Sequence, residues 1–195
     1  MPDTLTVQFS AIVPLAPTHK IGAFVSGNED IDRFLHDLAV AEQSLGLSQV
    51  YVAASAAGEV VAYFTLSPLT IRVEPALLER LRIGAAPYPA IGGFLLGRLG
   101  VTTGLQRQGV GEALVMRAAQ IAKREARVVG GMFLAVDPKN DQLVTWYAKQ
   151  EFMALGSKTR RMVLPLRAVP GSVPKLSRYA ASLTSNAIIR ASGID

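Results

Sequence analysis

The stretch Gln106-Arg107-Gln108-Gly109-Val110-Gly111 decides how the centre of this chain folds. It lies between an apolar segment, Gly93 to Val101, that predicts a strand, and a segment of helical periodicity, Gly109 to Arg127. A strand, a glycine turn and a helix start direct backbone N–H groups toward one point, which suits a phosphate. The first hypothesis is therefore a site for a phosphorylated cofactor. The alternative is a tight turn whose glycines only allow close packing.

Length and composition predict one globular unit. The chain has 195 residues, of which 50% are hydrophobic, so it can bury a full core. It has no cysteine, which excludes disulfides, thiolate–zinc sites and cysteine nucleophiles, and its only histidines are His19 and His36. We expect no metal site, and any catalysis must use tyrosine, carboxylates, amides or the backbone. No signal segment or membrane-spanning apolar run is found, so we expect a cytoplasmic protein with no membrane partner.

The charge balance is basic. Lysine and arginine number 20 against 15 acidic residues, which gives a net charge of +5 and a pI near 9.7. This balance favours an anionic partner or cofactor, nucleic acid included. A merely solvated basic surface explains the same charge equally well.

The N-terminal half predicts a helix followed by a hairpin. Asn28 is a plausible N-cap for a helix whose apolar side chains recur at Ile31, Phe34, Leu35, Leu38 and Ala41. Gln49–Ser55 and Val60–Ser67 are rich in β-branched and aromatic residues and predict a β-hairpin. Pro75 is expected to open a short helix that ends at Leu81.

The second half predicts alternating strands and helices. Gly130-Gly131 ends the helix that starts at Gly109, and a strand follows at Met132–Val136. Pro138 and Asn140 start another helix, and Met162–Leu166 is expected to close the sheet. The order of elements indicates an α/β (α+β) domain.

These residues resemble a known family. Gln106-x-x-Gly109-x-Gly111, with Asn140 and Tyr147 downstream, is similar to the acetyl-CoA core of the GNAT superfamily of N-acetyltransferases. The resemblance covers roughly Phe24 to Leu166 in element order. It implies the GNAT fold, a mixed central sheet splayed at its middle strands with helices on both faces, and acetyl-CoA as the cofactor.

A second set of residues resembles one branch of that family. Leu96-Gly97-Arg98-Leu99-Gly100-Val101, Tyr88-Pro89 and Tyr63-Phe64-Thr65-Leu66-Ser67 are similar to the acetyltransferase toxins of bacterial toxin–antitoxin pairs. This resemblance implies acetylation of the amino group of an aminoacyl-tRNA, which blocks translation. It also implies a homodimer and a small ribbon-helix-helix antitoxin as partner.

The chemistry of amine acetylation says which groups to look for. A neutral amine attacks a thioester, so the site needs donors for the developing oxyanion and an acid for the departing thiolate. Gly100, inside a strong strand, marks a bulge or a close approach of backbone. We expect this strand to splay from Met132–Val136, leaving unpaired backbone groups at Leu99 and Val101. These groups would hold the pantetheine and the thioester oxygen, with Leu99 as the catalytic donor.

The remaining cofactor contacts are expected in the turn and in the following helix. The diphosphate would lie on the backbone N–H groups of the turn, and Arg107 would add charge. Tyr147 is suited to protonate the thiolate, a role that the resemblance also implies; the alternative is a core aromatic beside Trp146. Asn140 contacts the cofactor or is only an N-cap or Asx-turn. The predicted cofactor-binding set is Leu99, Gly100, Val101, Gln106, Arg107, Gln108, Gly109, Val110, Gly111, Asn140 and Tyr147.

Candidate substrate contacts are cationic. Strand alternation places Arg98 on the face opposite Leu99, where it would line the substrate mouth. Lys158, Arg160 and Arg161 form a second basic cluster; simple solvated charges are the alternative for both. No carboxylate stands out as a general base, since Glu112 is expected to offset the dipole of its helix.

The expected organisation is an acetyltransferase domain at 1–166 and an extension at 167–195 with one amphipathic helix. That helix docks on its own domain, on a second copy or on a partner. Besides the toxin, two other functions remain open: an acetyltransferase for a small amine or a protein N-terminus, and a catalytically silent acetyl-CoA-binding module.

Overall fold

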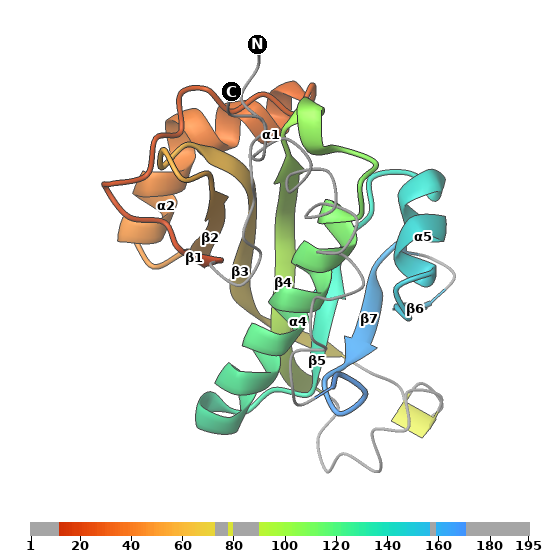
Figure 1. Cartoon of the computed structure of the whole chain (residues 1–195). Coiled ribbons are helices and arrows are strands. Elements are labelled where there is room, and N and C mark those ends of the chain that lie inside the picture. The colour runs from red at the N-terminus through yellow and green to blue at the C-terminus, as the bar shows by residue number, and fades with distance from the viewer. Residues whose placement is uncertain (1–11, 73–77, 80–89, 157–158, 171–195) are drawn as a thin grey trace, which may run out of the picture.

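The structure is a computed structural model that describes residues 12–72, 78–79, 90–156 and 159–170. Within these ranges, seven strands form one mixed sheet in the order β1-β2-β3-β4-β5-β7-β6 (Figure 1). The strands are β1 (Val13–Pro14), β2 (Gln49–Ala54), β3 (Val60–Arg72), β4 (Ala90–Val101), β5 (Phe133–Val136), β6 (Met153–Ala154) and β7 (Met162–Pro165). The expected α+β architecture with a mixed sheet is confirmed.

The strands pair antiparallel except at the centre. β2 and β3 form the predicted hairpin, and β3 runs beyond Ser67 to Arg72 along β4. β4 and β5 form the parallel pair. The expectation that the last strand closes the sheet is wrong, because β7 lies between β5 and β6. β1 and β6 escaped prediction since two residues carry no periodic pattern.

The N-terminal helical segment begins as predicted. The Asn28 side chain accepts hydrogen bonds from the N–H groups of Asp30 and Ile31, so it is the N-cap of α1 (Glu29–Arg33). A π-helical turn (Phe34–Leu38) then joins α1 to α2 (Ala39–Ser44). Such turns are rare, and they occur frequently at functional sites.

The long central helix α4 (Val110–Val129) follows the glycine turn. Gly109 is its left-handed N-cap, and Gly130 ends it. The shorter α5 (Asp141–Ala148) follows β5. Residues 73–77 and 80–89 lie outside the described residues, so of the helix expected from Pro75 to Leu81 only Leu78 and Glu79 are described, and both are helical.

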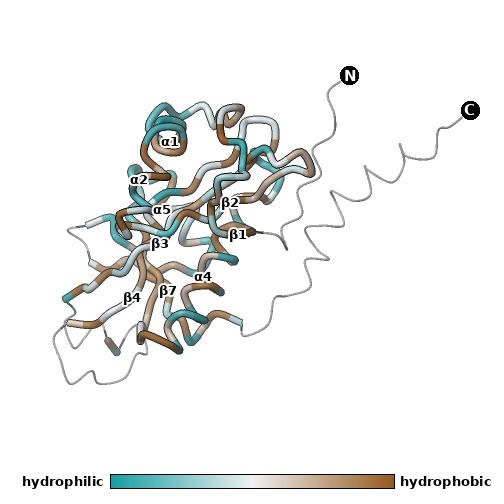
Figure 2. Tube along the Cα trace, turned by 90° about the vertical axis from the view of Figure 1, so that its left-hand side faces the viewer, coloured by the Kyte–Doolittle hydropathy of each residue, from teal (hydrophilic) through white to brown (hydrophobic). Residues whose placement is uncertain are grey.

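Helices cover both faces of the sheet. The alternating side chains of β2 show which helices pack on each face. Val50 and Val52 are buried with Phe34 and Leu35 of the α1–α2 segment, whereas Tyr51 and Ala53 are buried with side chains of α4. Figure 1 accordingly shows α4 crossing one face of the strands, with α1 and α2 behind the sheet at its β1–β2 end. In Figure 2, α1 and α4 carry both teal and brown segments, as amphipathic helices do.

The described chain ends against the core. Val169 is buried in the cluster that includes α4, and the Lys123 ammonium of α4 donates a hydrogen bond to the Val169 carbonyl. The helix expected within 167–195 falls on residues outside the described ranges, so the division at Leu166 stays a prediction.

Candidate active site

A cleft opens where the two central strands separate. β4 and β5 pair only at Phe94 with Leu134 and at Leu95 with Ala135, although β4 continues to Val101. The cleft beyond this point has a volume of about 670 Å³, a size that suits a small molecule or cofactor. Its lining comes from the end of β4, the glycine turn, α1, and the segment from β5 into α5. The predicted splay of the middle strands is thus present.

The β-bulge of β4 lies at Gly97–Arg98. Leu66 of β3 pairs with Leu96 and Phe64 with Leu99, so β4 carries one more residue than β3 between these two pairs. The bulge reading of Gly100 is wrong, because Gly100 pairs regularly with Tyr63. The close-approach reading holds: a Cβ atom at Gly100 would lie 2.6 Å from Ile31 Cγ2 and 2.7 Å from Tyr63 Cε1.

The bulge determines which backbone groups face the cleft. Before it, the Gly92 carbonyl accepts a hydrogen bond from the Met132 N–H, so the even-numbered residues of β4 face β5. After it, the Thr102 N–H donates to the Val61 carbonyl, so the even-numbered residues face β3. Leu99 and Val101 consequently direct their backbone groups away from β3, toward the gap that β5 leaves.

One of these groups has a partner that was not foreseen. The amide of Gln106 donates to the Val101 carbonyl at 2.9 Å and to the Ser26 carbonyl at 2.7 Å. The expectation of an unpaired carbonyl at Val101 is therefore wrong, because a side chain from the adjoining turn satisfies it. Gln106 lines the cleft while tying β4 to the loop before α1.

The glycine turn presents a row of N–H groups. Arg107 and Gly109 have positive φ angles of 59° and 80°, in the left-handed region that tight turns use. The first hydrogen bond of α4 runs from the Ala113 N–H to the Gly109 carbonyl, so the N–H groups at the helix start before Ala113 have no acceptor within the helix. These donors, at the positive end of the α4 dipole, fit an anionic phosphate group. Arg107 and Gly111 line the cleft, whereas the Gln108 amide donates to the Gly104 carbonyl and Val110 is buried in the core.

Tyr147 lies on the opposite wall of the cleft. Its ring makes edge-to-face contacts with Trp146 and Phe152, at centroid distances of 4.8 and 5.4 Å. The residue is 9% exposed, and burial raises the pKa of Tyr147 to about 12 because the phenolate would lose its hydration. The two interpretations of Tyr147 therefore combine: the ring packs in the core, and the residue lines the cleft with its phenol protonated at neutral pH.

Asn140 is the N-cap of α5. Its side-chain oxygen accepts a hydrogen bond from the Leu143 N–H at 2.9 Å, which supports the capping interpretation. Asn140 also lines the cleft.

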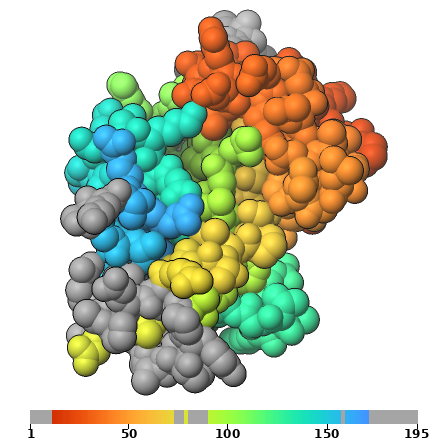
Figure 3. Space-filling view, turned by 180° about the vertical axis from the view of Figure 1, so that it is seen from behind, coloured from red at the N-terminus to blue at the C-terminus, as the bar shows by residue number. Residues whose placement is uncertain are grey.

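Arg98 lines the cleft from the α1–α2 face. Its guanidinium carbon lies 3.8 Å from the centroid of the Phe34 ring, and one of its nitrogens lies 3.8 Å from the Glu42 carboxylate. Phe34 is the first residue of the π-helical turn. Figure 3, seen from this side, shows β4 at the bottom of a hollow between the orange atoms of α1–α2 and the cyan and blue atoms of α5 and β7.

The described arginines of the second basic cluster, Arg160 and Arg161, form ion pairs outside the cleft. Arg160 pairs with Asp141 at 2.9 Å, and Arg161 donates to both carboxylate oxygens of Asp137. The Asp137 partner raises the pKa of Arg161. Neither arginine lines the cleft, and Lys158 lies outside the described residues.

Two contacts across the cleft were not predicted. The Trp146 indole donates to Glu112 of α4 at 3.1 Å, and Lys139 pairs with Asp30 of α1 at 2.8 Å. Lys139 lowers the pKa of the Asp30 carboxyl through this hydrogen bond. Each pair joins residues far apart in the sequence, so no local pattern could have revealed it.

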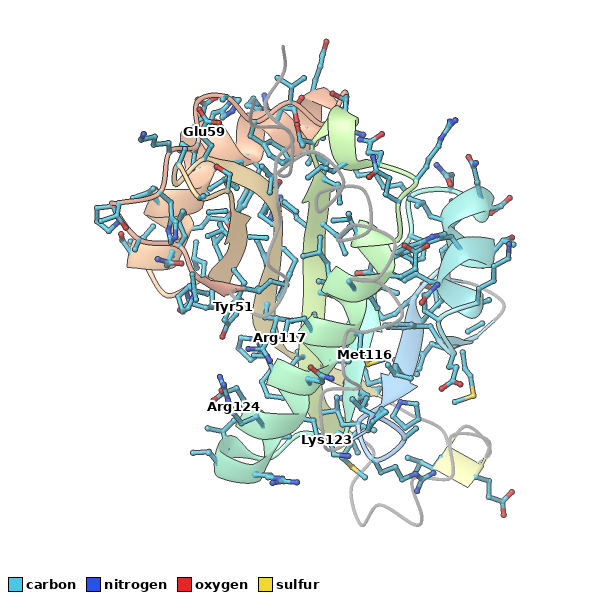
Figure 4. The ribbon with its side chains drawn as sticks, in the orientation of Figure 1. Tyr51, Glu59, Met116, Arg117, Lys123 and Arg124 are labelled. Carbon is cyan, nitrogen blue, oxygen red and sulfur yellow. The ribbon has the colours of Figure 1, made fainter. Side chains whose placement is uncertain are left out.

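Several other cations lie far from this cleft. Figure 4 shows Arg117, Lys123 and Arg124 projecting from the middle and C-terminal part of α4, on the sheet face opposite α1 and α2. Within the described ranges, no helix is long and apolar enough to cross a membrane and no cluster of three metal-ligating side chains occurs.

The cleft therefore combines an opened parallel strand pair, the glycine turn at the start of α4 and a tyrosine on the facing wall. Residues 27–152, well over half of the chain, match the acetyltransferase (GNAT) family. The chain therefore belongs to the GNAT family: it is an N-acetyltransferase, and acetyl-CoA is its acetyl donor.

Solved structures of similar fold include bacterial toxins. A tyrosine-to-phenylalanine mutant of KacT is 22% identical, with a TM-score of 0.73 over 86% of this chain and 98% of that one. AtaT complexed with acetyl-methionyl-tRNAfMet is 23% identical, with a TM-score of 0.73 over 85% and 96%. AtaTR bound with acetyl-CoA is 25% identical, with a TM-score of 0.70 over 86% and 97%. At this level of identity the likeness shows the fold.

Proposed function

We propose that this acetyltransferase is a toxin that acetylates the α-amino group of an aminoacyl-tRNA. The observation that carries the proposal is a cleft that combines the Leu99 backbone, the protonated Tyr147 and the cationic Arg98. The similar structures support it, since AtaT is a toxin and has been solved in complex with acetyl-methionyl-tRNAfMet.

The residues of the cleft divide the work of acetyl transfer. Acetyl-CoA supplies a thioester whose carbonyl carbon accepts the amine nitrogen and whose sulfur leaves. The N–H groups of residues 107–112 would hold the phosphates, with Arg107 beside them. The Leu99 N–H would stabilise negative charge on the carbonyl oxygen, and Tyr147 would give its proton to the sulfur as the carbon–sulfur bond breaks. The proton that the amine nitrogen loses on acylation would return to Tyr147 through solvent.

The acceptor side needs little help with deprotonation. The α-amino group of an aminoacyl ester has a lower pKa than an ordinary lysine side chain, so a much larger share of it is neutral near pH 7. Arg98 would face the RNA from the α1–α2 side, where Figure 3 shows the hollow. Its contact with Phe34 holds the guanidinium in place before the substrate arrives.

The same proposal extends to partners. AtaT has been solved bound to the C-terminus of the antitoxin AtaR, and we propose a small antitoxin and a homodimer for this protein by the same analogy.

The direct test offers radiolabelled acetyl-CoA and a pool of charged tRNA to the purified protein. We expect label in acetylated aminoacyl ester, and none with uncharged tRNA. Tyr147→Phe is the control, because it keeps the ring contacts with Trp146 and Phe152 but removes the proton. Expression of the wild type should arrest growth, and Tyr147→Phe should relieve the arrest.

Two outcomes would favour the alternatives. Transfer to a polyamine or a peptide N-terminus, with none to any charged tRNA, would assign a small-molecule or protein acetyltransferase. Binding of acetyl-CoA without turnover on any amine would assign a silent binding module.

A further inference from the structure

A buried hydroxyl on β3 supports the bulge of β4. Thr65 is 2% exposed, and its Oγ1 accepts a hydrogen bond from the Arg98 backbone N–H at 3.0 Å. The same oxygen lies 3.1 Å from the position that a Cβ atom at residue 97 would take. The hydroxyl thus occupies the space that Gly97 leaves free and pairs an N–H group that the bulge has removed from the regular ladder.

The extra residue changes both the backbone and the side chains after it. In a regular strand continuing from Leu96, Arg98 and Gly100 would turn their backbone groups toward β5, and the Arg98 side chain would enter the apolar layer under α4. With the bulge, Leu99 turns its backbone to the cleft, and its side chain packs in that apolar layer. The Arg98 guanidinium lies on the other face, over Phe34.

We propose that Thr65 is a positioning residue for acetyl transfer: its hydroxyl holds the bulge that aims the Leu99 N–H into the cleft and places Arg98 on the acceptor side. This inference rests on the proposed role of the Leu99 N–H. Without the hydroxyl, the partly buried Arg98 N–H has no acceptor, and the strand relieves this by shifting toward a regular ladder. Leu99 then turns away from the cleft.

Two matched variants separate the hydroxyl from the shape of the side chain. Thr65→Val keeps the volume and removes the acceptor, whereas Thr65→Ser keeps the acceptor and removes only a methyl group. We expect Thr65→Val to lower kcat about 10²-fold, the effect of losing one oxyanion donor. The Kd for acetyl-CoA should stay near the wild-type value, and Thr65→Ser should retain most of the activity.

The Kd can be read from the chain itself. Trp146 is the only tryptophan and lines the cleft, so its fluorescence should change when acetyl-CoA binds.

A spectroscopic measurement tests the geometry without turnover. Isotope-edited infrared spectroscopy follows the thioester carbonyl of acetyl-CoA bound to each variant. In the wild type and in Thr65→Ser, a donor at Leu99 should lower the stretching frequency below its value in buffer. In Thr65→Val the stretching frequency should be higher than in the wild type and close to its value in buffer.

The outcomes distinguish this inference from the proposed function. If the wild-type carbonyl shows no shift, Leu99 is not a donor and the proposed mechanism fails. If the wild type shows the shift and Thr65→Val retains both shift and kcat, the Thr65 inference is overturned. Loss of acetyl-CoA binding in parallel with kcat in Thr65→Val would also overturn it, in favour of a purely structural role.

A second variant keeps the test decisive if Thr65→Val fails to fold. Gly97→Ala retains the hydroxyl but presses a methyl group against it at 3.1 Å. We expect the same loss of kcat and the same rise in carbonyl frequency. Wild-type values of both in the folded Gly97→Ala protein would overturn the inference.

Discussion

The indole N–H of Trp146 donates a hydrogen bond to the carboxylate of Glu112 at 3.1 Å, and this bond joins α5 to the first turn of α4. Gly111 lies against the same ring, since a Cβ atom there would be 3.3 Å from Trp146 Cζ2. The turn proposed to hold the phosphates and the helix that carries Tyr147 are therefore held in one arrangement.

Glu112→Ala should lower the free energy of unfolding. The substitution leaves the partly buried Trp146 N–H without its acceptor, which costs about 1–3 kcal/mol. Urea denaturation followed by circular dichroism measures the loss. Glu112→Gln is the control because its amide oxygen still accepts; equal losses in the two variants would mean that the bond contributes little.

Gly100→Ala should destabilise the protein through overpacking. The new methyl group would lie 2.6 Å from Ile31 Cγ2 and 2.7 Å from Tyr63 Cε1. Relief requires shifts of buried side chains, at a cost of about 1–3 kcal/mol. The matched control is Gly92→Ala in the same strand, where no atom lies within 4 Å of the added Cβ. An unchanged Tm in Gly100→Ala would show that α1 moves away freely.

Tyr147→Phe should reduce kcat with little effect on the Kd for acetyl-CoA. The ring contacts remain, and the only group lost is the proton donor, whose contribution is typically about 10²–10⁴-fold in rate. Stopped-flow acetyl transfer and Trp146 fluorescence measure the two quantities separately. A variant with wild-type kcat would mean that solvent protonates the thiolate.

The unfolding free energy of the wild type relative to that of Tyr147→Phe should decrease at alkaline pH. The pKa of Tyr147 is raised to about 12 in the folded state, against about 10 in the unfolded chain. The buried neutral phenol therefore contributes fully below about pH 10, and its contribution falls as the pH rises toward 12. We expect the unfolding free energy of the wild type, measured relative to that of Tyr147→Phe, to be lower by about 1 kcal/mol near pH 11 than at neutral pH. A difference that stays constant from pH 8 to about 11.5 would contradict the burial of the phenol.

Arg98→Ala should weaken the use of charged tRNA while acetyl-CoA binding persists. Loss of one phosphate contact should reduce the salt dependence of kcat/KM by about one unit of slope. Arg124→Ala is the control, because Arg124 pairs with Glu125 on the face of the sheet away from α1 and α2 (Figure 4). Equal effects of the two substitutions would indicate general electrostatic attraction instead of a contact in the cleft.

Much of the fold was predictable because its signals are local. The hairpin of β2 and β3 follows from two β-rich runs around a turn, and α4 from an apolar stripe between Gly109 and Gly130. The N-caps Asn28 and Asn140 act within three residues of themselves. These features need only the chain's own neighbours, so their residue types suffice.

The details of the cleft were less accessible. A glycine in β4 suggested a bulge, but β4 contains four glycines, and only the pairing with β3 distinguishes Gly97 from Gly100. The bonds of Gln106 and the ion pairs of Arg160 and Arg161 likewise depend on partners distant in the sequence.

The sequence by itself indicated the family through the resemblance of its motifs. It also determined the order of the main elements and the residues of the glycine turn, because apolar periodicity and turn chemistry act over a few residues. Only the tertiary structure decided which backbone groups of β4 face the cleft and which cations are already paired. Both depend on register and on contacts between strands and helices, and a single inserted residue in β4 reverses every face that follows it.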